Sequence, residues 1–291
     1  MLIDLFIGYI QAEKRFSVLT VEAYRSDMEQ FFGFLKDGFE IDDLTQVKVT
    51  HVKTYIVYLK EKGLVNRSIN RKMSTLRTFY KYCLRENLLE KSPMVGIKAL
   101  KQPKELVRFV TESDIDKVSF GEDDSFCTQR DRLIFELLYQ TGMRQAELRG
   151  LKDGDIDKKG MLLKIHGKRN KDRMAPLSNE MIQLIDKYQA LRDATFTTKA
   201  DCLLLNDKGE GMSSSYIYNK VHHMLEGVTS LKQKSPHVLR HTFATHLLNE
   251  GASLVAIQKL LGNENLATTQ IYAHNTIEQL KQIHKQAHPK G

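Results

Sequence analysis

The segment SPHVLRHTFATH, residues 235–246, decides which fold and function this sequence is expected to have. Ser235 and Pro236 have the pattern of a helix N-cap and first helical position, which puts His237 in the first turn, where an anion is favoured. Arg240 follows three residues later, a spacing that places both side chains on one helix face. Without a further residue, a capping histidine and a surface arginine would be the preferred interpretation.

An isolated tyrosine, Tyr272, follows Arg240 by 32 residues in the stretch TTQIYAH. A histidine moves protons, an arginine holds a phosphate and a phenol can attack one, so the three suggest covalent chemistry on a phosphodiester. A phenol with a pKa of about 10 is a weak nucleophile, and it needs neighbouring cations and a base. Taken alone, Tyr272 would be a packing tyrosine, because the chain has 11 tyrosines.

Two cations upstream have positions that suit a phosphate. Attack on a phosphodiester gathers negative charge on the non-bridging oxygens, so catalysis needs fixed cations around the phosphorus. Arg144 follows the helix-breaking Gly142, and its guanidinium can hold two phosphate oxygens. Lys168 begins the polar tip of a predicted hairpin and can donate a proton to the leaving oxygen. On chemistry alone, Arg169 or Lys171 could donate this proton equally well. A lysine in a turn is more often a solvated side chain with no catalytic role.

The charge distribution points to a polyanionic partner. Of the 291 residues, 44 are Lys or Arg and 36 are Asp or Glu, an excess that could be ordinary surface charge. Residues 1–59 contain 6 basic and 9 acidic side chains, whereas residues 60–104 contain 12 and 3. A concentrated basic block is the expected footprint of nucleic acid, although a solvated helix face explains this block alone about equally well.

The first hundred residues predict a helical unit. Apolar side chains recur at helical spacing in residues 2–12, after an N-cap at Thr20, in residues 49–60 and in residues 66–86. The last of these helices has an apolar stripe from Ile69 to Tyr80 between basic flanks, which suits a groove reader or phosphate tracker. The candidate DNA contacts are Arg67, Arg71, Lys72, Arg77, Lys81, Lys101 and Lys104.

A basic linker over residues 98–108 is expected to be exposed, and a second unit begins near Phe109. Strands are predicted at 161–165 and 173–177 around the polar tip, and Cys202 to Leu205 is a candidate third strand. The predicted helices of this unit are 128–140, a short one opened by Arg144, and about 178–192, 213–226, 236–249, 253–261 and 265–272.

Several classes of protein are excluded. The three cysteines are far apart without a Cys-x-x-Cys spacing, so neither a disulfide framework nor a zinc site is indicated, and a reducing cytoplasm fits. The N-terminus has an early acid and no long apolar run, so no signal peptide is expected. No stretch approaches about 20 consecutive apolar residues, so no membrane span is predicted.

Taken together, these segments resemble the tyrosine recombinase (phage integrase) family, and within it the Xer-type recombinases, over essentially the whole chain. The most specific segments are residues 141–148, 237–246 and 260–272. Weaker matches are the tip 167–171 and the opening Thr20-x-x-x-Tyr24-x-x-Asp27.

The resemblance implies a mainly α, two-domain fold. Residues 1–97 would form a four-helix, SAM-like core-binding domain, and residues 109–291 an α+β catalytic domain of helices with a small three-stranded antiparallel sheet. Residues 276–287 would be a C-terminal helix that docks on a neighbouring protomer. The two domains would close around double-stranded DNA as a clamp, with four protomers acting on two sites.

The resemblance also implies a role for each candidate site residue. Tyr272 would form a 3′-phosphotyrosyl bond, Arg144 and Arg240 would clamp the scissile phosphate, Lys168 would protonate the 5′-oxygen, and His237 would be a general acid/base. Because the covalent bond stores the energy of the broken one, no ATP, no metal and no other cofactor is expected.

One position departs from the family. The residue after Leu-Leu-Gly is usually histidine, sometimes tryptophan, and here it is Asn263. An amide still donates a hydrogen bond but cannot carry a proton charge, so we expect cleavage to be reduced or differently tuned, not lost.

The expected role is Xer-type resolution of chromosome dimers, and the expected location is the cytoplasm, at the nucleoid. Other functions compete with this role. A DNA invertase or mobile-element integrase would use the same residues. A type IB topoisomerase shares the chemistry, but the lack of large insertions and the predicted docking helix argue against it. Asn263 makes a non-catalytic DNA-binding protein more credible, and the other site residues argue against that. The target sequence and the need for a second, related recombinase stay open.

Overall fold

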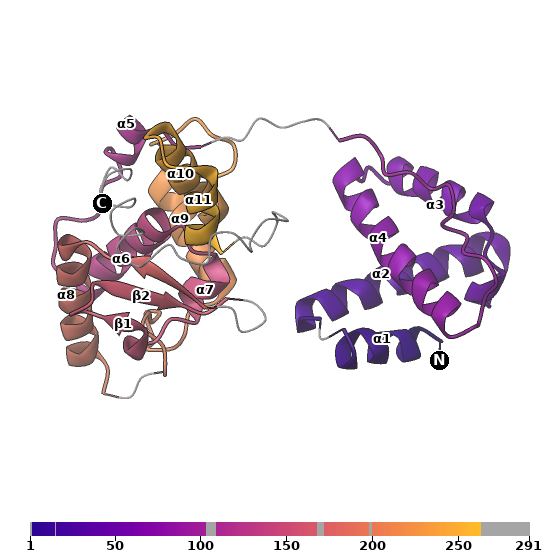
Figure 1. The fold of residues 1–291 in the computed structure, drawn as a ribbon, viewed down its shortest axis with the longest axis horizontal. Helices are drawn as coiled ribbons and strands as arrows, with labels where there is room; N and C mark the ends of the chain where they lie inside the picture. The colour runs from indigo at the N-terminus through magenta and orange to yellow at the C-terminus, as the bar shows by residue number, and fades with distance from the viewer. Residues whose placement is uncertain (1, 15, 103–108, 168–171, 198–199, 263–291) are drawn as a thin grey trace. The chain divides into compact units, whose positions relative to one another are not determined.

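The chain folds as two compact units, residues 1–105 and 106–291, in a computed structural model that describes residues 2–14, 16–102, 109–167, 172–197 and 200–262 (Figure 1). The fold is mainly α with one three-stranded antiparallel sheet, which confirms the predicted class. Each unit has its own apolar core. None of the described helices is long and apolar enough to cross a membrane.

The first unit consists of α1 (Leu2–Ala12), α2 (Val18–Phe39), the 3-10 helix η1 (Leu44–Gln46), α3 (Val49–Glu61) and α4 (Asn66–Arg85). Helix α2 packs against the other three α-helices, and the predicted stripe of α4 lies in the core. The predicted N-cap at Thr20 is wrong. The N-cap of α2 is Ser17, and the Thr20 hydroxyl, already inside the first turn, lies 2.8 Å from the Ser17 hydroxyl.

A buried carboxylate joins α2 to α4. Asp27 is 2% exposed and accepts hydrogen bonds from Arg71 Nη2 at 2.7 Å, Lys72 Nζ at 2.9 Å and Thr75 Oγ1 at 2.8 Å. Burial raises the pKa of Asp27, but the hydrogen bonds, led by Arg71, lower it more, so the net shift is downward. The expectation that Lys72 contacts DNA is corrected, because its ammonium is buried against Asp27.

The start of the predicted linker is attached to α4. Asn70 donates to the Leu100 carbonyl at 2.9 Å and accepts from the Leu100 amide at 2.8 Å. Asn66 donates to the Lys101 carbonyl, and Arg77 donates to the Ile97 carbonyl, each at 2.8 Å. The backbone of residues 97–101 is therefore held against the helix, although the side chain of Lys101 is exposed as expected. Lys104 lies outside the described residues.

The second unit is built around α6 (Phe126–Thr141), which packs against α8, α9 and α10 and is buried on almost every side. Helices α10 and α11 lie side by side (Figure 1). The described part of the unit confirms the predicted helices, with shifts at their ends. The predicted helix 265–272 lies outside it. The other elements are α5 (Glu112–Ile115), α7 (Gln145–Arg149), η2 (Asp153–Asp155), α8 (Asn179–Thr195), α9 (Ser214–Leu225), α10 (Pro236–Asn249) and α11 (Leu254–Leu261).

The sheet has the order β1-β2-β3, with β1 (Ile156–Asp157), β2 (Leu162–Ile165) and β3 (Arg173–Pro176). In the antiparallel register, Leu163 of β2 pairs with both Ile156 and Ala175. The predicted hairpin is confirmed, but the predicted third strand is wrong. Residues 202–205 are an apolar segment that does not join the sheet. Leu203, Leu204 and Leu205 are buried, and Leu205 forms only an isolated bridge.

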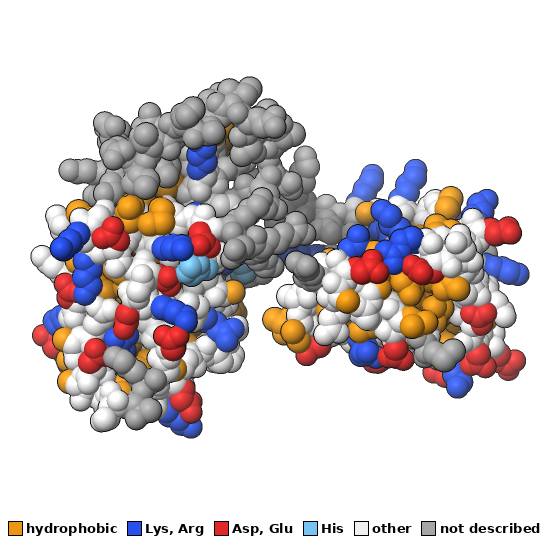
Figure 2. Space-filling model, turned by 60° about the horizontal axis from the view of Figure 1, so that its bottom comes forward, with side chains coloured by type: hydrophobic (Ala, Val, Ile, Leu, Met, Phe, Trp, Pro, Cys, Tyr) orange, Lys and Arg blue, Asp and Glu red, His pale blue; other side chains and the backbone are white. Residues whose placement is uncertain are grey.

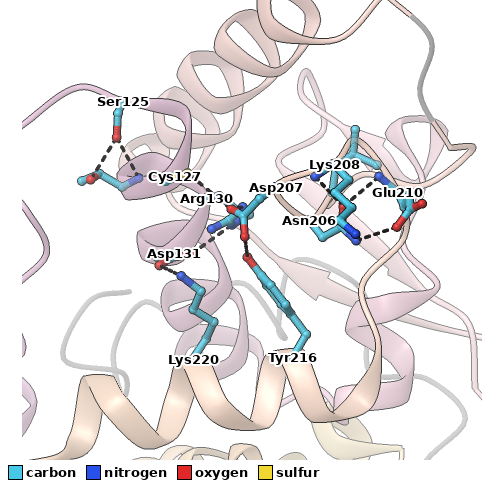
Figure 3. Close-up of polar contacts among 12 residues, drawn as sticks. Ser125, Cys127, Arg130, Asp131, Asn206, Asp207, Lys208, Glu210, Tyr216 and Lys220 are labelled. Carbon is cyan, nitrogen blue, oxygen red and sulfur yellow. Dashed lines mark hydrogen bonds and ion pairs between the residues drawn. The ribbon is translucent and has the colours of Figure 1, made fainter.

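An ionic network ties α6 to α9 (Figure 3). Arg130, which is fully buried, donates to Asp131 Oδ1 at 3.0 Å and to Asp207 Oδ1 at 2.7 Å. Tyr216 of α9 donates to Asp207 Oδ2 at 3.1 Å, and Lys220 of α9 donates to Asp131 Oδ2 at 2.7 Å. Two carboxylates thus offset the cost of burying one guanidinium.

Part of the segment 237–246 has a structural role. Thr242 Oγ1 accepts from the Val110 amide at 3.0 Å, and His246 Nε2 lies 2.9 Å from the Val110 carbonyl oxygen. The Tyr139 hydroxyl lies 3.0 Å from His246 Nδ1. A carbonyl only accepts, so these partners assign the proton to Nε2 and make Nδ1 the acceptor. The two side chains of α10 therefore hold the segment that enters the second unit.

Candidate active site

The turn after α6 places the first arginine of the site. Gly142 ends the helix with φ 58° and ψ 24°, in the left-handed region. A Cβ on Gly142 would lie 2.4 Å from Phe243 Cδ1 and 2.8 Å from Leu261 Cδ2, so glycine is required by conformation and by space. Arg144 then becomes the N-cap of α7, which agrees with the prediction that it opens the next helix.

Arg240 joins the ends of two helices. From α10, its Nη1 donates to the Gly142 carbonyl at 2.6 Å, and its Nη2 donates to the Leu261 carbonyl at 2.8 Å. The residue is only 8% exposed. The guanidinium is therefore fixed between the C-terminal ends of α6 and α11, and backbone carbonyls at the helix ends accept its hydrogen bonds.

Glu147 links two more arginines. Its Oε2 accepts from the Arg144 amide at 2.7 Å and from Arg173 Nη2 at 2.9 Å, and its Oε1 accepts from Arg144 Nη1 at 2.8 Å. The side chains of Glu147 and Arg173 are 7% and 8% exposed, whereas that of Arg144 is 34% exposed. We call Arg144, Glu147, Arg173 and Arg240 the arginine cluster.

The arginine cluster contains more positive than negative charge. Burial, followed by the neighbouring charges of Arg144 and Arg173, lowers the pKa of Arg240 to about 10, although Glu147 opposes the shift. Burial raises the pKa of Glu147, but hydrogen bonds from Arg173 and from the Arg144 amide reverse the shift, so the net direction is downward. Three guanidinium groups whose charges interact, with only one carboxylate among them, therefore form a partly buried site that favours an added anion.

The predicted site residues that lie in the described part of the chain are Arg144, His237 and Arg240. Arg144 and Arg240 lie close enough for their charges to interact. His237 lies in the first turn of α10, one turn before Arg240, and is exposed. Ser235 is the N-cap and Pro236 the first helical residue, as predicted, but the Ser235 side chain makes no capping hydrogen bond.

Lys168, Asn263 and Tyr272 lie outside the described residues. Described residues near these positions in the sequence belong to the arginine cluster or contact it. Arg173 is the first residue of β3 and follows Lys168 by five residues, and the carbonyl of Leu261, two residues before Asn263, binds Arg240.

Sequence reasoning missed Glu147 and Arg173 as members of the site. A signal existed for Glu147, because an acid three residues after a helix N-cap commonly accepts from the N-cap amide. No comparable pattern marked Arg173, a basic residue in a strand whose partners lie 26 and 87 residues away.

The predicted DNA contacts of the first unit separate into exposed and attached side chains. Arg67, Arg71, Lys81 and Lys101 are exposed, whereas Arg77 is half-buried and bound to the Ile97 carbonyl. Arg71 is held by Asp27 although half of its side chain is exposed. Figure 2 shows basic side chains gathered along one edge of this unit.

Comparison with known proteins identifies the family. Residues 108–279 match the phage integrase family, and residues 3–87 match the phage integrase N-terminal SAM-like domain. The chain belongs to the phage integrase family. It is 36% identical to a protein from Bacillus pumilus and 37% identical to one from Staphylococcus saprophyticus, both named tyrosine recombinase XerC. The matches cover 100% and 98% of this chain and 97% and 96% of those relatives, which confirms the Xer-type resemblance.

Solved structures share the fold. The XerH site-specific recombinase in a post-cleavage complex with its palindromic difH substrate is 23% identical, with a TM-score of 0.72 over 91% of this chain and 79% of that one. The Tn1549 transposon integrase with transposon right end DNA is 22% identical, also with a TM-score of 0.72, over 97% of both chains.

Proposed function

We propose that this chain is a site-specific DNA recombinase that cuts and rejoins DNA through a tyrosine. The observation that carries the proposal is the arginine cluster, in which two guanidinium groups bind one carboxylate and the third, that of Arg240, lies close enough for its charge to interact with theirs. A phosphodiester supplies the missing negative charge. Arg144 and Arg240 have the planar, bidentate donors that fit its non-bridging oxygens.

The proposed reaction exchanges one phosphodiester for another. The Tyr272 oxygen attacks the phosphorus as its proton passes to His237, and the bond from phosphorus to the 5′-oxygen breaks. Lys168 donates a proton to that oxygen, so a free 5′-hydroxyl leaves and a 3′-phosphotyrosyl bond remains. Attack by a 5′-hydroxyl of the partner strand reverses the steps and releases the tyrosine. Arg144 and Arg240 stabilise the negative charge of each transition state.

We infer that the substrate is double-stranded DNA and that the biological role is Xer-like, as in resolution of chromosome dimers. Full-length similarity to proteins named XerC supports this role over that of an invertase, a mobile-element integrase or a non-catalytic DNA-binding protein. The proposed active form is a tetramer on two DNA sites, with or without a second related recombinase. Its place is the cytoplasm, at the nucleoid, because its substrate lies there.

Covalent trapping tests the proposal. The purified full chain is incubated with fragmented genomic DNA from the organism that encodes it, denatured adducts are captured, and the attached DNA is sequenced. A duplex oligonucleotide of the recovered site, nicked close to the scissile phosphate, then serves as a suicide substrate, because the short cleaved piece diffuses away and prevents rejoining.

Wild type is expected to accumulate a denaturation-resistant adduct, and Tyr272→Phe is expected to form none while it still binds the duplex. Arg144→Ala and Arg240→Ala are expected to slow adduct formation by about 100-fold or more, as loss of one transition-state donor does elsewhere. Binding without any adduct from wild type would leave only a DNA-binding module. An adduct from Tyr272→Phe would show that another residue is the nucleophile.

A further inference from the structure

We propose that Arg173 is a positioning residue for the cleavage step. Its side chain holds the C-terminal end of α11 against the pair Arg144–Glu147. The inference rests on the proposed function. Its importance follows from the path of the chain, because α11 ends at Leu261 and the proposed nucleophile, Tyr272, lies only ten residues beyond Gly262 in the sequence.

The contacts of Arg173 join three segments of the second unit. From the first residue of β3, its Nη2 donates to Glu147 of α7 at 2.9 Å, and its Nε donates to the carbonyl of Leu260 in α11 at 2.8 Å. A guanidinium has donors in a rigid, planar fork, so one side chain satisfies both acceptors at a fixed separation. A lysine has all of its donors on one nitrogen at the end of a flexible stem, so it would hold the two acceptors less rigidly.

The end of α11 is held by two neighbouring arginines. Arg173 binds the Leu260 carbonyl and Arg240 binds the Leu261 carbonyl, both in the last turn, where the helix dipole favours cations. Gly262 follows in the left-handed conformation with φ 63°, and a Cβ there would lie 3.2 Å from Arg173 Cδ. Arg173 therefore packs directly against the residue at which the chain leaves the helix.

The two contacts connect Arg173 to a proposed phosphate-binding arginine and to the helix that precedes the proposed nucleophile in the sequence. Through Glu147 it acts on Arg144, which shares the same carboxylate. Through Leu260 it acts on the end of α11. A displacement of about 1 Å in a reacting group can slow a reaction about 100-fold, so loss of Arg173 should affect cleavage far more than DNA binding.

Arg192 supplies a matched control. It too is buried, and it donates to the carboxylate of Asp153 at 2.8 Å and to the carbonyl of Leu203 at 2.9 Å. Neither Asp153 nor Leu203 belongs to the arginine cluster. Arg192→Ala therefore removes a buried guanidinium from the same unit without touching the proposed positioning contacts.

The experiment compares Arg173→Ala, Arg173→Lys and Arg192→Ala with wild type. The substrate is the nicked suicide duplex that contains the recovered DNA site. The measurements are thermal unfolding, the Kd of the uncleaved duplex, and the rate of adduct formation at saturating DNA. We expect Arg173→Ala to slow adduct formation by about 100-fold with a Kd within about threefold of wild type. Arg173→Lys should be intermediate, and Arg192→Ala should lose thermal stability yet keep the wild-type rate.

A pH profile separates positioning from general destabilisation. Arg173 is the first of the groups that lower the pKa of Glu147, so its removal should raise that pKa. The titration of the Glu147 carboxyl, followed by NMR, should then move to higher pH in Arg173→Ala and stay in place in Arg192→Ala.

The outcomes distinguish this inference from the proposed function. Adduct formation by folded Arg173→Ala at the wild-type rate overturns the inference alone, as does a slowing no larger than that of Arg192→Ala. If Arg173→Ala does not fold, Arg173→Lys decides: a wild-type rate overturns the inference, and a slowed rate with normal Kd supports it. A wild-type protein that forms no adduct overturns both proposals.

Discussion

Arg240 Nη1 donates a 2.6 Å hydrogen bond to the carbonyl oxygen of Gly142, a residue 98 positions earlier in the chain. The acceptor belongs to the backbone, so the position of this arginine depends on the path of the chain after α6. That path in turn requires the left-handed conformation of Gly142. The glycine is thus as much a part of the site as the side chain that it binds.

Gly142→Ala is expected to destabilise the fold and to slow cleavage. The new Cβ would meet Phe243 at 2.4 Å, and the left-handed conformation is itself unfavourable for alanine. Together these effects should cost about 3 kcal/mol, measured by urea denaturation. Gly63→Ala is the control, because Gly63 has φ 80° but nothing within 4 Å of a Cβ. It should cost about 1 kcal/mol, and equal losses in both variants would contradict the steric argument.

Asp27→Asn should destabilise the first unit by about 3 kcal/mol, because it leaves the buried ammonium of Lys72 without a compensating charge. The pKa of Asp27 is lowered in the fold, so its contribution is present above the ordinary carboxyl pKa and is lost as the pH falls through the lowered value. Asp42→Asn, which removes an exposed partner of Lys36 at 4.0 Å, should change stability by less than about 1 kcal/mol. A similarly small change for Asp27→Asn would refute the idea that Asp27 stabilises the first unit by compensating the buried charge of Lys72.

His246 should make stability fall in mild acid. Burial lowers its pKa in the fold, so below about pH 6.5 the unfolded chain binds more protons than the folded one. The contribution is fully present above that pH, and its loss approaches about 1.4 kcal/mol per pH unit. His246→Gln should flatten the acid slope. His166→Gln should instead alter the slope above about pH 6.5, because hydrogen bonds to Asp155 and Asp172 raise the pKa of His166, and its contribution is lost as the pH rises through the raised value. Parallel slopes in the two variants would show that neither histidine is linked in this way.

DNA binding should weaken steeply with salt, because phosphate contacts release counterions. Arg67→Gln and Lys81→Gln, at exposed positions of α4, should each reduce the slope of log Kd against log salt by about 1. Lys53→Gln removes one exposed charge from α3 and is the control, with no expected change. An equal effect of all three variants would mean that net charge, not α4, determines affinity.

Asn263→His should change the rate of adduct formation on the suicide duplex. The family usually has histidine here, and an imidazole can carry a proton charge that an amide cannot. We expect faster cleavage by the variant, measured at saturating DNA and at several pH values. Asn263→Gln keeps an amide and serves as the comparison. An Asn263→His rate equal to wild type would remove the proposed role of this position.

Much of the fold could be predicted because the signals for a helix lie in residues that are close together in the sequence. The predicted bounds of α1 and α10 agree with the structure, since apolar spacing and the Ser-Pro start are properties of neighbouring residues. The third strand could not be predicted, because β1 has only two residues and its pairing with β2 depends on the partner. The apolar segment 202–205 indicated burial, which the prediction mistook for strand pairing.

The sequence by itself determined the class of protein, through Arg144, His237, Arg240 and Tyr272 in a specific order and spacing. Only the tertiary structure decided which charged residues support them. Lys72 and Arg71 are adjacent in sequence, yet one is buried and the other half exposed, and Arg173 reaches acceptors in two distant helices. Hydrogen bonds and ion pairs act over a few ångströms of space, whatever the separation along the chain, so the positions that complete this site became visible only once the helices were packed.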